Sequence, residues 1–489
     1  MLEARQLTDI GFEYVIEKLE PWSPFGEELR RRVRPYAQTE CEELRLELAN
    51  VALLAEEYKA SPAAFGSLAR ILMQLKDIRR SLARCRETTL SDIELFEIKR
   101  FLIVSEGLED AAGAVPAIEK LNGIRLYKLT AALDILDPEG LRTQTFRLAD
   151  GSSELLRDIR KKRKETDIAL RAAENGAEKD ALSAERTRLA AMEENEETRL
   201  RGEMTRAFSA YADELEALIV SVGRLDFALA KARLALELGG TVPDILPENG
   251  EKRIVFTDMV NPEIRAALAE RGGEFTPVTI ALQPGSTVIT GANMGGKSVA
   301  VKTCCLTALL AVCGMPVFCR KAELPLLPDI HLLSEDMEDS RGGLSSFGAE
   351  MVRFDGILRS CENAPGSLVL LDEFARGTNP HEGSALVRAA VRYFNKKNSA
   401  YALITTHFDD VACLAPVHYQ VMGLRNADEA ALTAALFAAG AGVSPAELLS
   451  KFMDYGLFRA RNDANPPRDA LKICRALRIS EEFMAGVEE

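Results

Sequence analysis

The chain has 489 residues, of which 47% are hydrophobic, and its formal net charge is −14. The length suggests about three domains with enough apolar material for sizeable cores, and no run of about 18 apolar residues predicts a membrane span. The acidic balance argues against a globally basic nucleic-acid-binding protein, although a local basic patch could still act because salt screens charges beyond about 10 Å at 0.1 M.

The targeting and redox signals are those of a cytoplasmic protein. The amino terminus soon meets charged residues and shows no apolar signal region. Nine cysteines occur without a Cys-x-x-Cys pair, and only four histidines are present. This composition makes a zinc site a poor expectation and fits a reducing compartment.

Residues 1–150 predict a helical core domain. Glu40–Tyr58 and Leu68–Cys85 each have apolar residues at helical spacing. Ser91 and Glu94 predict a helix start with a capping box. Asp137–Gly140, with the sequence Asp-Pro-Glu-Gly, predicts a turn.

Residues 151–240 predict long lever helices with an antiparallel hairpin. Alanine, glutamate, lysine and arginine dominate residues 152–238, and Glu174–Gly176 offers a turn. The first arm would reach roughly 36 Å at 1.5 Å per residue. A thin apolar seam is expected from Leu182, Leu189 and Met192.

Five consecutive basic residues in the first arm are the nucleic-acid candidates: Arg160, Lys161, Lys162, Arg163 and Lys164. Contacts with phosphates would depend on salt but not on base sequence. Consecutive helical positions point all round the axis, however, so the five cannot face one groove together. Glutamates of the second arm could pair with them, which leaves a solvated charged hairpin as the alternative: Glu193, Glu194, Glu196 and Glu197.

Residues 241–425 predict an α/β domain, because short apolar strands alternate with helical patterns. The expected strands are Arg253–Phe256, Ser286–Thr290, Leu368–Leu371 and Tyr401–Thr405. Between one strand and the next helix lies a Gly-x4-Gly-Lys-Ser motif, which predicts a loop whose backbone amides bind phosphates. Its residues are Gly291, Ala292, Asn293, Met294, Gly295, Gly296, Lys297 and Ser298. Lys297 would bind the β- and γ-phosphates of ATP, and the Ser298 hydroxyl would bind Mg²⁺.

The next two strands supply the remaining chemistry. Asp372 follows the apolar strand Leu368–Leu371 and would orient Mg²⁺, while Glu373 would position or deprotonate the attacking water. His407 follows Tyr401–Thr405 and suits a γ-phosphate sensor. The expected activity is therefore ATP hydrolysis.

These motifs resemble those of the MutS family. Thr290–Ser298 resembles its phosphate loop, with Ala292 where proline is usual, and Asp372–Gly383 resembles its Walker B segment, with Ala375 where glycine is usual. Three further segments are similar to its entry helix, signature loop and histidine switch: Leu225–Arg233, Gly343–Met351 and Thr406–Phe408. The similarity is closest to the subfamily that lacks mismatch reading.

The resemblance implies an ABC-type homodimer in which the signature loop of one subunit completes the site of the other. Ser345 would then contact the partner's γ-phosphate, and residues 426–489 would form a C-terminal helical dimerisation region. Phe275 is a candidate for stacking on adenine, and a core role for it is equally open. The fold expected overall is a multidomain α and α/β protein.

The resemblance leaves two cargoes open. The first is branched or duplex DNA, bound through the lever hairpin without a mismatch-reading wedge. The triplet Phe25-Gly26-Glu27 has the composition of such a wedge but is interpreted as a coincidence, because no α/β reading domain surrounds it. The second is a protein client, since short MutS-like proteins are thought to help reactivate cobalamin-dependent aminomutases. A structural clamp driven by ATP is a third possibility.

Overall fold

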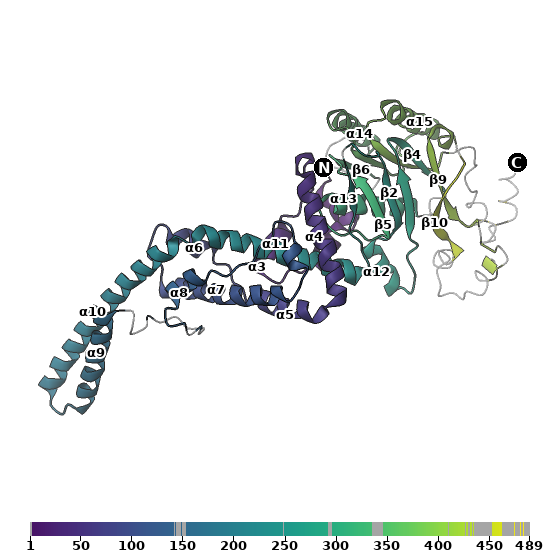
Figure 1. The fold of residues 1–489 in the computed structure, drawn as a ribbon. Coiled ribbons are helices and arrows are strands. Elements are labelled where there is room, and N and C mark those ends of the chain that lie inside the picture. The colour runs from purple at the N-terminus through teal and green to yellow at the C-terminus, as the bar shows by residue number, and fades with distance from the viewer. Residues whose placement is uncertain are drawn as a thin grey trace. The chain divides into compact units, whose positions relative to one another are not determined.

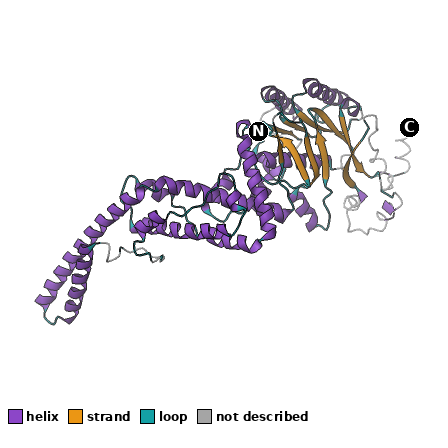
Figure 2. Cartoon of the chain, in the orientation of Figure 1, coloured by secondary structure: helices purple, strands orange, loops and turns teal. Residues whose placement is uncertain are grey.

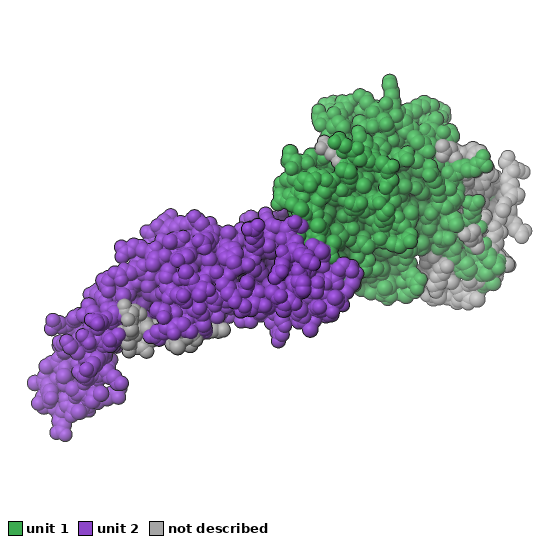
Figure 3. Space-filling view, in the orientation of Figure 1, with its two compact units in different colours: residues 1–19, 33–52, 231–489 green, residues 20–32, 53–230 purple. Residues whose placement is uncertain are grey.

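The computed structural model describes most of the chain and divides it into two compact units, coloured separately in Figure 3. The sheet unit comprises residues 1–19, 33–52 and 231–489, and the helical unit comprises residues 20–32 and 53–230. None of the helices in the described part of the chain is long and apolar enough to cross a membrane. The described residues are 2–140, 142, 148, 153–247, 249–291, 296–334, 346–408, 410–425, 427–428, 431–432, 434, 452–461, 474, 480 and 483.

The described residues of the helical unit form helices joined by loops and no strands. Two helices, α4 (Cys41–Ala60) and α11 (Ala212–Leu238), contribute residues to both units. The others are α3 (Pro24–Arg31), α5 (Pro62–Leu72), α6 (Arg79–Cys85), α7 (Asp92–Gly113), the short η2 (Ile118–Lys120), α8 (Thr130–Leu136), α9 (Glu154–Ala172) and α10 (Gly176–Ser209). The helix expected over residues 40–58 is confirmed by α4.

The single helical stretch expected over residues 68–85 is wrong, because the chain breaks between α5 and α6. The Asp77 carboxylate accepts the backbone N–H of Arg79, the first residue of α6, at 3.1 Å. The capping box of α7 is confirmed: the Ser91 hydroxyl accepts the Glu94 N–H, and the Glu94 carboxylate accepts the Ser91 N–H. The predicted turn is also present, with Gly140 N–H donating to the Asp137 carbonyl at 2.9 Å.

Helices α9 and α10 form the predicted antiparallel hairpin (Figure 1). Asn175 caps α10 by accepting the Glu178 N–H. With 19 residues, α9 is roughly 28 Å long at 1.5 Å per residue, shorter than the expected arm. The expected seam holds at Leu189, which is buried, and is wrong at Met192, which is 39% exposed.

The triplet Phe25-Gly26-Glu27 belongs to the core of the helical unit. The Phe25 side chain is 4% exposed, and its ring meets the Phe101 ring edge-on at 6.0 Å. The backbone just before it is anchored by Asp226, whose carboxylate accepts the N–H groups of Trp22 and Ser23. A side chain at Gly26 would collide with that carboxylate. The triplet therefore packs within the helical unit and is not exposed as a wedge.

The sheet unit contains two sheets. The four-stranded sheet has the order β1-β5-β2-β3, and the six-stranded sheet has the order β10-β9-β4-β8-β7-β6. In the six-stranded sheet all neighbouring strands are parallel except β10 and β9. The strands are β1 (Asp244–Leu246), β2 (Ile254–Met259), β3 (Val278–Leu282), β4 (Gly285–Thr290), β5 (Lys321–Pro325), β6 (Ile330–Leu333), β7 (Leu368–Leu371), β8 (Tyr401–Thr406), β9 (Val417–Gly423) and β10 (Asp454–Arg459).

Helices cover the sheets, as Figure 2 shows with strands in orange and helices in purple. Two of them, α14 and α15, share an apolar cluster with one face of the six-stranded sheet, to which Val288, Val369 and Ala402 contribute. The helices of this unit are α1 (Ala4–Asp9), α2 (Phe12–Lys18), η1 (Gln38–Glu40), α12 (Pro262–Glu270), α13 (Lys297–Val312), α14 (Ser346–Asn363), α15 (Pro380–Lys397) and η4 (Ala412–Leu414). The mixed helical and α/β character expected from the sequence is confirmed.

The structure corrects one expectation near the C-terminus. Residues 426–489 were expected to be helical, yet Asp454–Arg459 forms β10 at the edge of the six-stranded sheet. Tyr455 and Phe458 are types that favour strands, and Leu457, Phe458 and Arg459 pair with β9. The helix expected from Asp469 lies largely outside the described residues. The four-part domain division stays a prediction.

Candidate functional site

Three of the predicted motifs meet at one edge of the six-stranded sheet. Strands β4, β8 and β7 are adjacent and parallel, so their carboxyl ends lie together. Thr290 pairs with Thr406, and Leu371 pairs with Ile404. The residues that follow these ends are Gly291, His407 and Asp372. Ligands of open α/β sheets bind outside this edge.

The two ends of the glycine-rich loop are described, whereas Ala292, Asn293, Met294 and Gly295 lie outside the described residues. Gly291 has φ 145° and Gly296 has φ 82°, both in the range that favours glycine. A Cβ at Gly291 would lie 3.1 Å from Val421, and one at Gly296 would lie 3.0 Å from the Tyr455 ring. Strands β9 and β10 therefore leave room for backbone alone at both positions.

Lys297 begins α13 and is 2% exposed. Its Nζ donates to the Gly291 carbonyl at 2.7 Å and lies 3.4 Å from a carboxylate oxygen of Glu373. Burial lowers the pKa of Lys297, and the neighbouring Glu373 and Asp372 carboxylates oppose that shift. A buried ammonium is stabilised by nearby anionic groups, and a bound phosphate would be a further one.

Asp372 is buried at the end of β7 and is held by two hydroxyl groups. Thr405 Oγ1 donates to its carboxylate at 2.6 Å, and Ser298 donates a second hydrogen bond. Burial raises the pKa of Asp372, while both hydrogen bonds oppose the rise. Ser298 and Asp372 are thus in direct contact, as a shared metal site would require.

The Thr405 hydroxyl holds both acids, because it also accepts the backbone N–H of Glu373 at 2.9 Å. Thr405 is fully buried on β8, opposite the end of β7. Thr405 lies in the strand expected over residues 401–405, but its role in holding the two acids was not expected from the sequence. A polar residue at the end of an otherwise apolar strand was the available signal.

The segment after β7 has an unusual backbone. Glu373 has φ 50° and Ala375 has φ 61°, which residues other than glycine rarely adopt. Arg376 donates to the Glu373 carboxylate at 2.7 Å, and the Ala375 N–H donates to Glu350 at 3.0 Å. The left-handed backbone at Ala375 gives a physical reason why glycine is usual there in the pattern that the segment resembles.

The structure leaves the roles of three other predicted residues untested. His407 is exposed just after β8, with its ring centroid 4.3 Å from that of Phe408. Phe275 is half-buried in the loop before β3. Ser345 lies outside the described residues. Their roles stay predictions.

The five basic residues of the hairpin fall into two groups. Arg160 is 11% exposed and pairs with Glu193 at 3.0 Å and Glu197 at 2.8 Å, and Arg163 also pairs with Glu193. Lys161, Lys162 and Lys164 are exposed and form no ion pair with the described residues. The two arginines therefore hold the arms together, and the three lysines face solvent.

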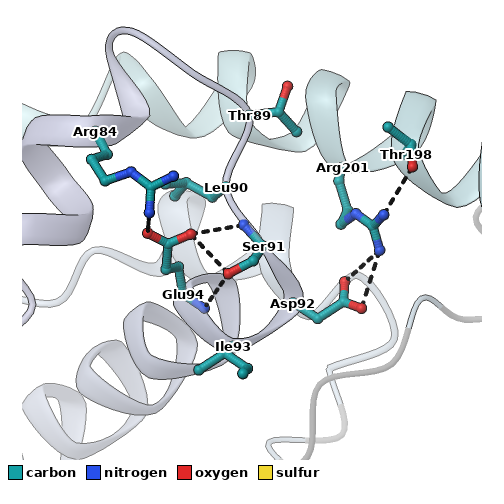
Figure 4. A pocket seen from close by; sticks show the side chains of 9 residues that line it. All are labelled: Arg84, Thr89, Leu90, Ser91, Asp92, Ile93, Glu94, Thr198 and Arg201. Carbon is teal, nitrogen blue, oxygen red and sulfur yellow. Dashed lines mark hydrogen bonds and ion pairs between the residues drawn. The ribbon is translucent and has the colours of Figure 1, made fainter.

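A pocket in the helical unit lies between the start of α7 and α10 (Figure 4). Its volume is about 520 Å³, and its charged groups are already paired with one another. Arg201 bonds both carboxylate oxygens of Asp92, and Arg84 bonds Glu94. The first pair joins α10 to α7, and the second joins α6 to α7. The charged groups of the pocket thus link helices of the unit to one another.

The sheet unit belongs to the class of α/β domains with parallel strands, and the buried lysine and the two acids form a candidate ligand site at the carboxyl edge of those strands. Residues 287–440 match the family model of MutS domain V. Over these residues the chain is similar to domain V of the MutS family.

Curated relatives match the C-terminal half of the chain. The chain is 34% identical to Endonuclease MutS2 of Thermomicrobium roseum over 244 residues, which cover 49% of this chain and 30% of that protein. It is 31% identical to Endonuclease MutS2 of Enterococcus faecalis over 45% of this chain and 27% of that protein. It is also 31% identical to the DNA mismatch repair protein MutS of Solibacter usitatus over 47% of this chain and 26% of that protein. The chain thus spans less than a third of each of these relatives.

Proposed function

We propose that this protein is an ATPase whose nucleotide site lies at the carboxyl edge of β4, β8 and β7. The observation that carries the proposal is the contact between Lys297 and Glu373 at 3.4 Å, with Asp372 beside them. Lys297 would bind the β- and γ-phosphates, and the loop of residues 291–296 would donate backbone N–H groups to them. Glu373 would orient the attacking water and accept its proton.

The residues present fit a magnesium ion bound with the nucleotide. Mg²⁺ prefers oxygen ligands and is usually held by one or two protein groups together with phosphates. The Ser298 hydroxyl and the Asp372 carboxylate are such groups, and they are already hydrogen-bonded to each other. The ion would neutralise charge on the phosphates when bound. Asp372 and Ser298 would hold it.

We also propose that Lys297 and Glu373 pair with each other in the site before a nucleotide binds. Glu373 bonds Arg376 as well, so the acid is held by two cations. A γ-phosphate would compete for Lys297 and release one of these pairs. Glu373 would then be free to orient water while Arg376 keeps it in place.

We propose further that the site is completed in a homodimer, with Ser345 of one subunit at the γ-phosphate of the other and His407 sensing that phosphate. The match to MutS domain V supports this arrangement. Residues 426–489 would contribute to the dimer contact, and Phe275 is the candidate for stacking on adenine.

The test of the ATPase is the variant Glu373→Gln. Glutamine keeps the shape of the side chain but cannot accept the proton of water. The variant should bind ATP with an affinity near that of the wild type, lose turnover and accumulate as a closed dimer. Turnover equal to that of the wild type would refute the assignment of the base.

For the cargo we propose DNA, branched or duplex, bound through the α9–α10 hairpin without a mismatch wedge. The exposed lysines Lys161, Lys162 and Lys164 support this proposal, as do the names of the relatives. Arg157 extends the exposed basic surface one turn earlier on α9, since it lies four residues before Lys161. The lever helices would move with the nucleotide state.

DNA binding at several salt concentrations tests this cargo. A variant with glutamine at Lys161, Lys162 and Lys164 should bind more weakly, and the slope of log K against log salt should fall by roughly 0.9 for each lysine that contacts a phosphate. A matched control replaces Lys59, Lys76 and Lys120, which are exposed elsewhere in the helical unit. It should leave the slope unchanged. If the wild type binds no duplex or junction at any salt concentration, the DNA proposal fails and a protein client becomes the alternative to pursue.

A further inference from the structure

The side chain of His418 joins the strand that leads into the glycine-rich loop to the segment that follows β10. His418 lies on β9 and is 1% exposed. Its Nε2 lies 2.8 Å from the hydroxyl oxygen of Thr290, the last residue of β4, and its Nδ1 lies 3.1 Å from the Arg461 carbonyl oxygen. The backbone N–H of Ala460 also donates to the His418 carbonyl at 3.0 Å. His418 therefore contacts both the start of the loop and the segment after β10.

The partners of the His418 ring determine which nitrogen carries its proton. Burial lowers the pKa of His418, although the bond to the Arg461 carbonyl opposes that shift, so the ring is neutral at pH 8. A neutral imidazole has one donor nitrogen and one acceptor nitrogen. The Arg461 carbonyl can only accept, so the proton lies on Nδ1, and Nε2 accepts the hydrogen bond of the Thr290 hydroxyl. The bonds thus run in one direction, from Thr290 to His418 to Arg461.

Thr290 is the point at which the chain leaves β4 and enters the loop. It is fully buried, and its backbone pairs with Thr406 on one side and Gln420 on the other. The next residue, Gly291, accepts a hydrogen bond from the Lys297 Nζ at its carbonyl, at 2.7 Å. The bond to His418 restricts the Thr290 side chain to one orientation. A fixed Thr290 in turn fixes where the first carbonyl of the loop meets the lysine.

Strands β9 and β10 also limit the loop by steric contact. A Cβ at Gly291 would lie 3.1 Å from Val421 of β9. A Cβ at Gly296 would lie 3.0 Å from the Tyr455 ring of β10. Such contacts exclude side chains but have no preferred direction, whereas a hydrogen bond weakens steeply when its angle changes. The bond from Thr290 to His418 therefore adds the directional part of the support.

We infer that His418 is a positioning residue for the phosphate loop, because it holds Thr290, and with it the start of the loop, to the segment after β10. The inference rests on the proposed ATPase. A loop that is already held in its binding conformation loses less entropy around the phosphates, so ATP binds more tightly. His418 is not among the groups proposed to contact phosphates or water, so its contribution falls on ATP binding and not on the rate of hydrolysis.

The first test is equilibrium binding of ATP by Thr290→Val and Thr290→Ser. Valine keeps the shape of the side chain but removes the hydroxyl that bonds His418, so the Kd for ATP should rise on the order of 10-fold, the effect of about one net hydrogen bond. Serine keeps the hydroxyl and should bind ATP nearly as tightly as the wild type. The kcat at saturating ATP should change little in either variant. A valine variant that binds ATP as tightly as the serine variant would overturn the inference.

A double-mutant cycle with His418→Phe tests whether the two residues act through one bond. Phenylalanine keeps a flat ring but has neither nitrogen, so this change alone should also raise the Kd for ATP. The variant with both Thr290→Val and His418→Phe should bind ATP about as weakly as His418→Phe alone, because the second change removes a bond that is already lost. Additive effects of the two changes on log Kd would contradict the inference.

The matched control for stability is His331→Phe. His331 is also largely shielded from solvent, and it lies on β6, at the opposite edge of the same sheet from β10, with its Nε2 3.3 Å from Asp329. This variant should leave the Kd for ATP unchanged even where it lowers Tm. A rise in Kd equal to that of His418→Phe would show that general weakening of the sheet, and not the bond to Thr290, reduces ATP binding.

Nitrogen NMR of the histidine-labelled protein tests the direction of the bonds without ATP. The chain has four histidines, so the signal that is missing from His418→Phe assigns His418. At pH 8 its proton should lie on Nδ1, whereas free histidine prefers the proton on Nε2. A proton on Nε2 of His418 would overturn the inference. If the wild type shows the expected proton position but does not bind ATP, the proposed function itself has failed, which is distinguishable from a failure of His418 to position the loop.

Discussion

The Thr405 hydroxyl offers the sharpest test of how the two acids are held. Replacing Thr405 with valine keeps the shape of the side chain but removes the hydroxyl that bonds Asp372 at 2.6 Å and the Glu373 N–H at 2.9 Å. Both partners are buried, so neither regains a bond to water. An unsatisfied buried polar group costs about 1–3 kcal/mol. Because Asp372 keeps its bond from Ser298, we expect a total loss of roughly 2–4 kcal/mol.

Calorimetric thermal unfolding measures this loss. A change of 1 kcal/mol shifts Tm by roughly 2–4 °C in a domain of 150–250 residues, so a loss of roughly 2–4 kcal/mol should lower the transition of the sheet unit by about 4–16 °C. The matched control is Thr405→Ser, which keeps the hydroxyl and loses one methyl group, at a cost of about 1 kcal/mol. A valine variant as stable as the serine variant would refute the reasoning.

The loss should also depend on pH. Burial raises the pKa of Asp372 above its ordinary value of 3.8, so the stability linked to its bound proton is present below that value and is lost as pH rises through the folded-state pKa. The Thr405 bond lowers the folded-state pKa, and its removal raises that pKa further. The difference in stability between the valine variant and the wild type should therefore be larger at pH 7 than at pH 5. The opposite trend would show that Asp372 is not the group that loses its partner.

Three further predictions concern the site and the hairpin. Lys297→Ala should abolish ATP binding in an equilibrium titration, and tight binding by this variant would contradict the phosphate-loop assignment. Gly383→Ala would place a Cβ 2.7 Å from the Ala375 carbonyl, so we expect a loss of about 1–3 kcal/mol in unfolding free energy together with slower turnover. Arg160→Met should destabilise the helical unit by about 1–3 kcal/mol because two glutamates lose a buried partner, whereas the exposed control Lys162→Met should stay within about 0.5 kcal/mol.

Local patterns predicted the strands of the six-stranded sheet well where the pattern was strong. Leu368–Leu371 is β7 with the expected bounds, and the expected strands over residues 286–290 and 401–405 differ from β4 and β8 by one residue each. Four apolar residues followed by two acids are typical of a buried strand whose end carries polar side chains. The same reasoning missed β10, because an edge strand depends on the partner that it pairs with.

The candidate site was predictable in composition and only partly in geometry. Lys297, Asp372 and Glu373 were expected together, and the structure places Lys297 3.4 Å from Glu373, with Asp372 near enough to influence the pKa of the lysine. The contributions of Thr405 and Arg376 were not expected, because they depend on which strand lies beside β7 and on how the chain turns after it.

The hairpin shows the same limit. The run of five basic residues was visible in the sequence, and so were the glutamates that could pair with it. Only the antiparallel packing of α9 against α10 determined that Arg160 and Arg163 pair with those glutamates while Lys161, Lys162 and Lys164 stay exposed.

The sequence by itself determined the composition of the candidate edge site, because glycine, lysine, serine and acid side chains at these spacings are what phosphate and metal binding would require locally. The tertiary structure decided which groups hold that chemistry in place: Thr405 under both acids, Glu350 on the Ala375 amide, and Phe25 inside the helical core. The physical reason is that each of these roles depends on a contact between residues at least 25 positions apart. Such contacts are set by packing and strand order, which no local pattern encodes.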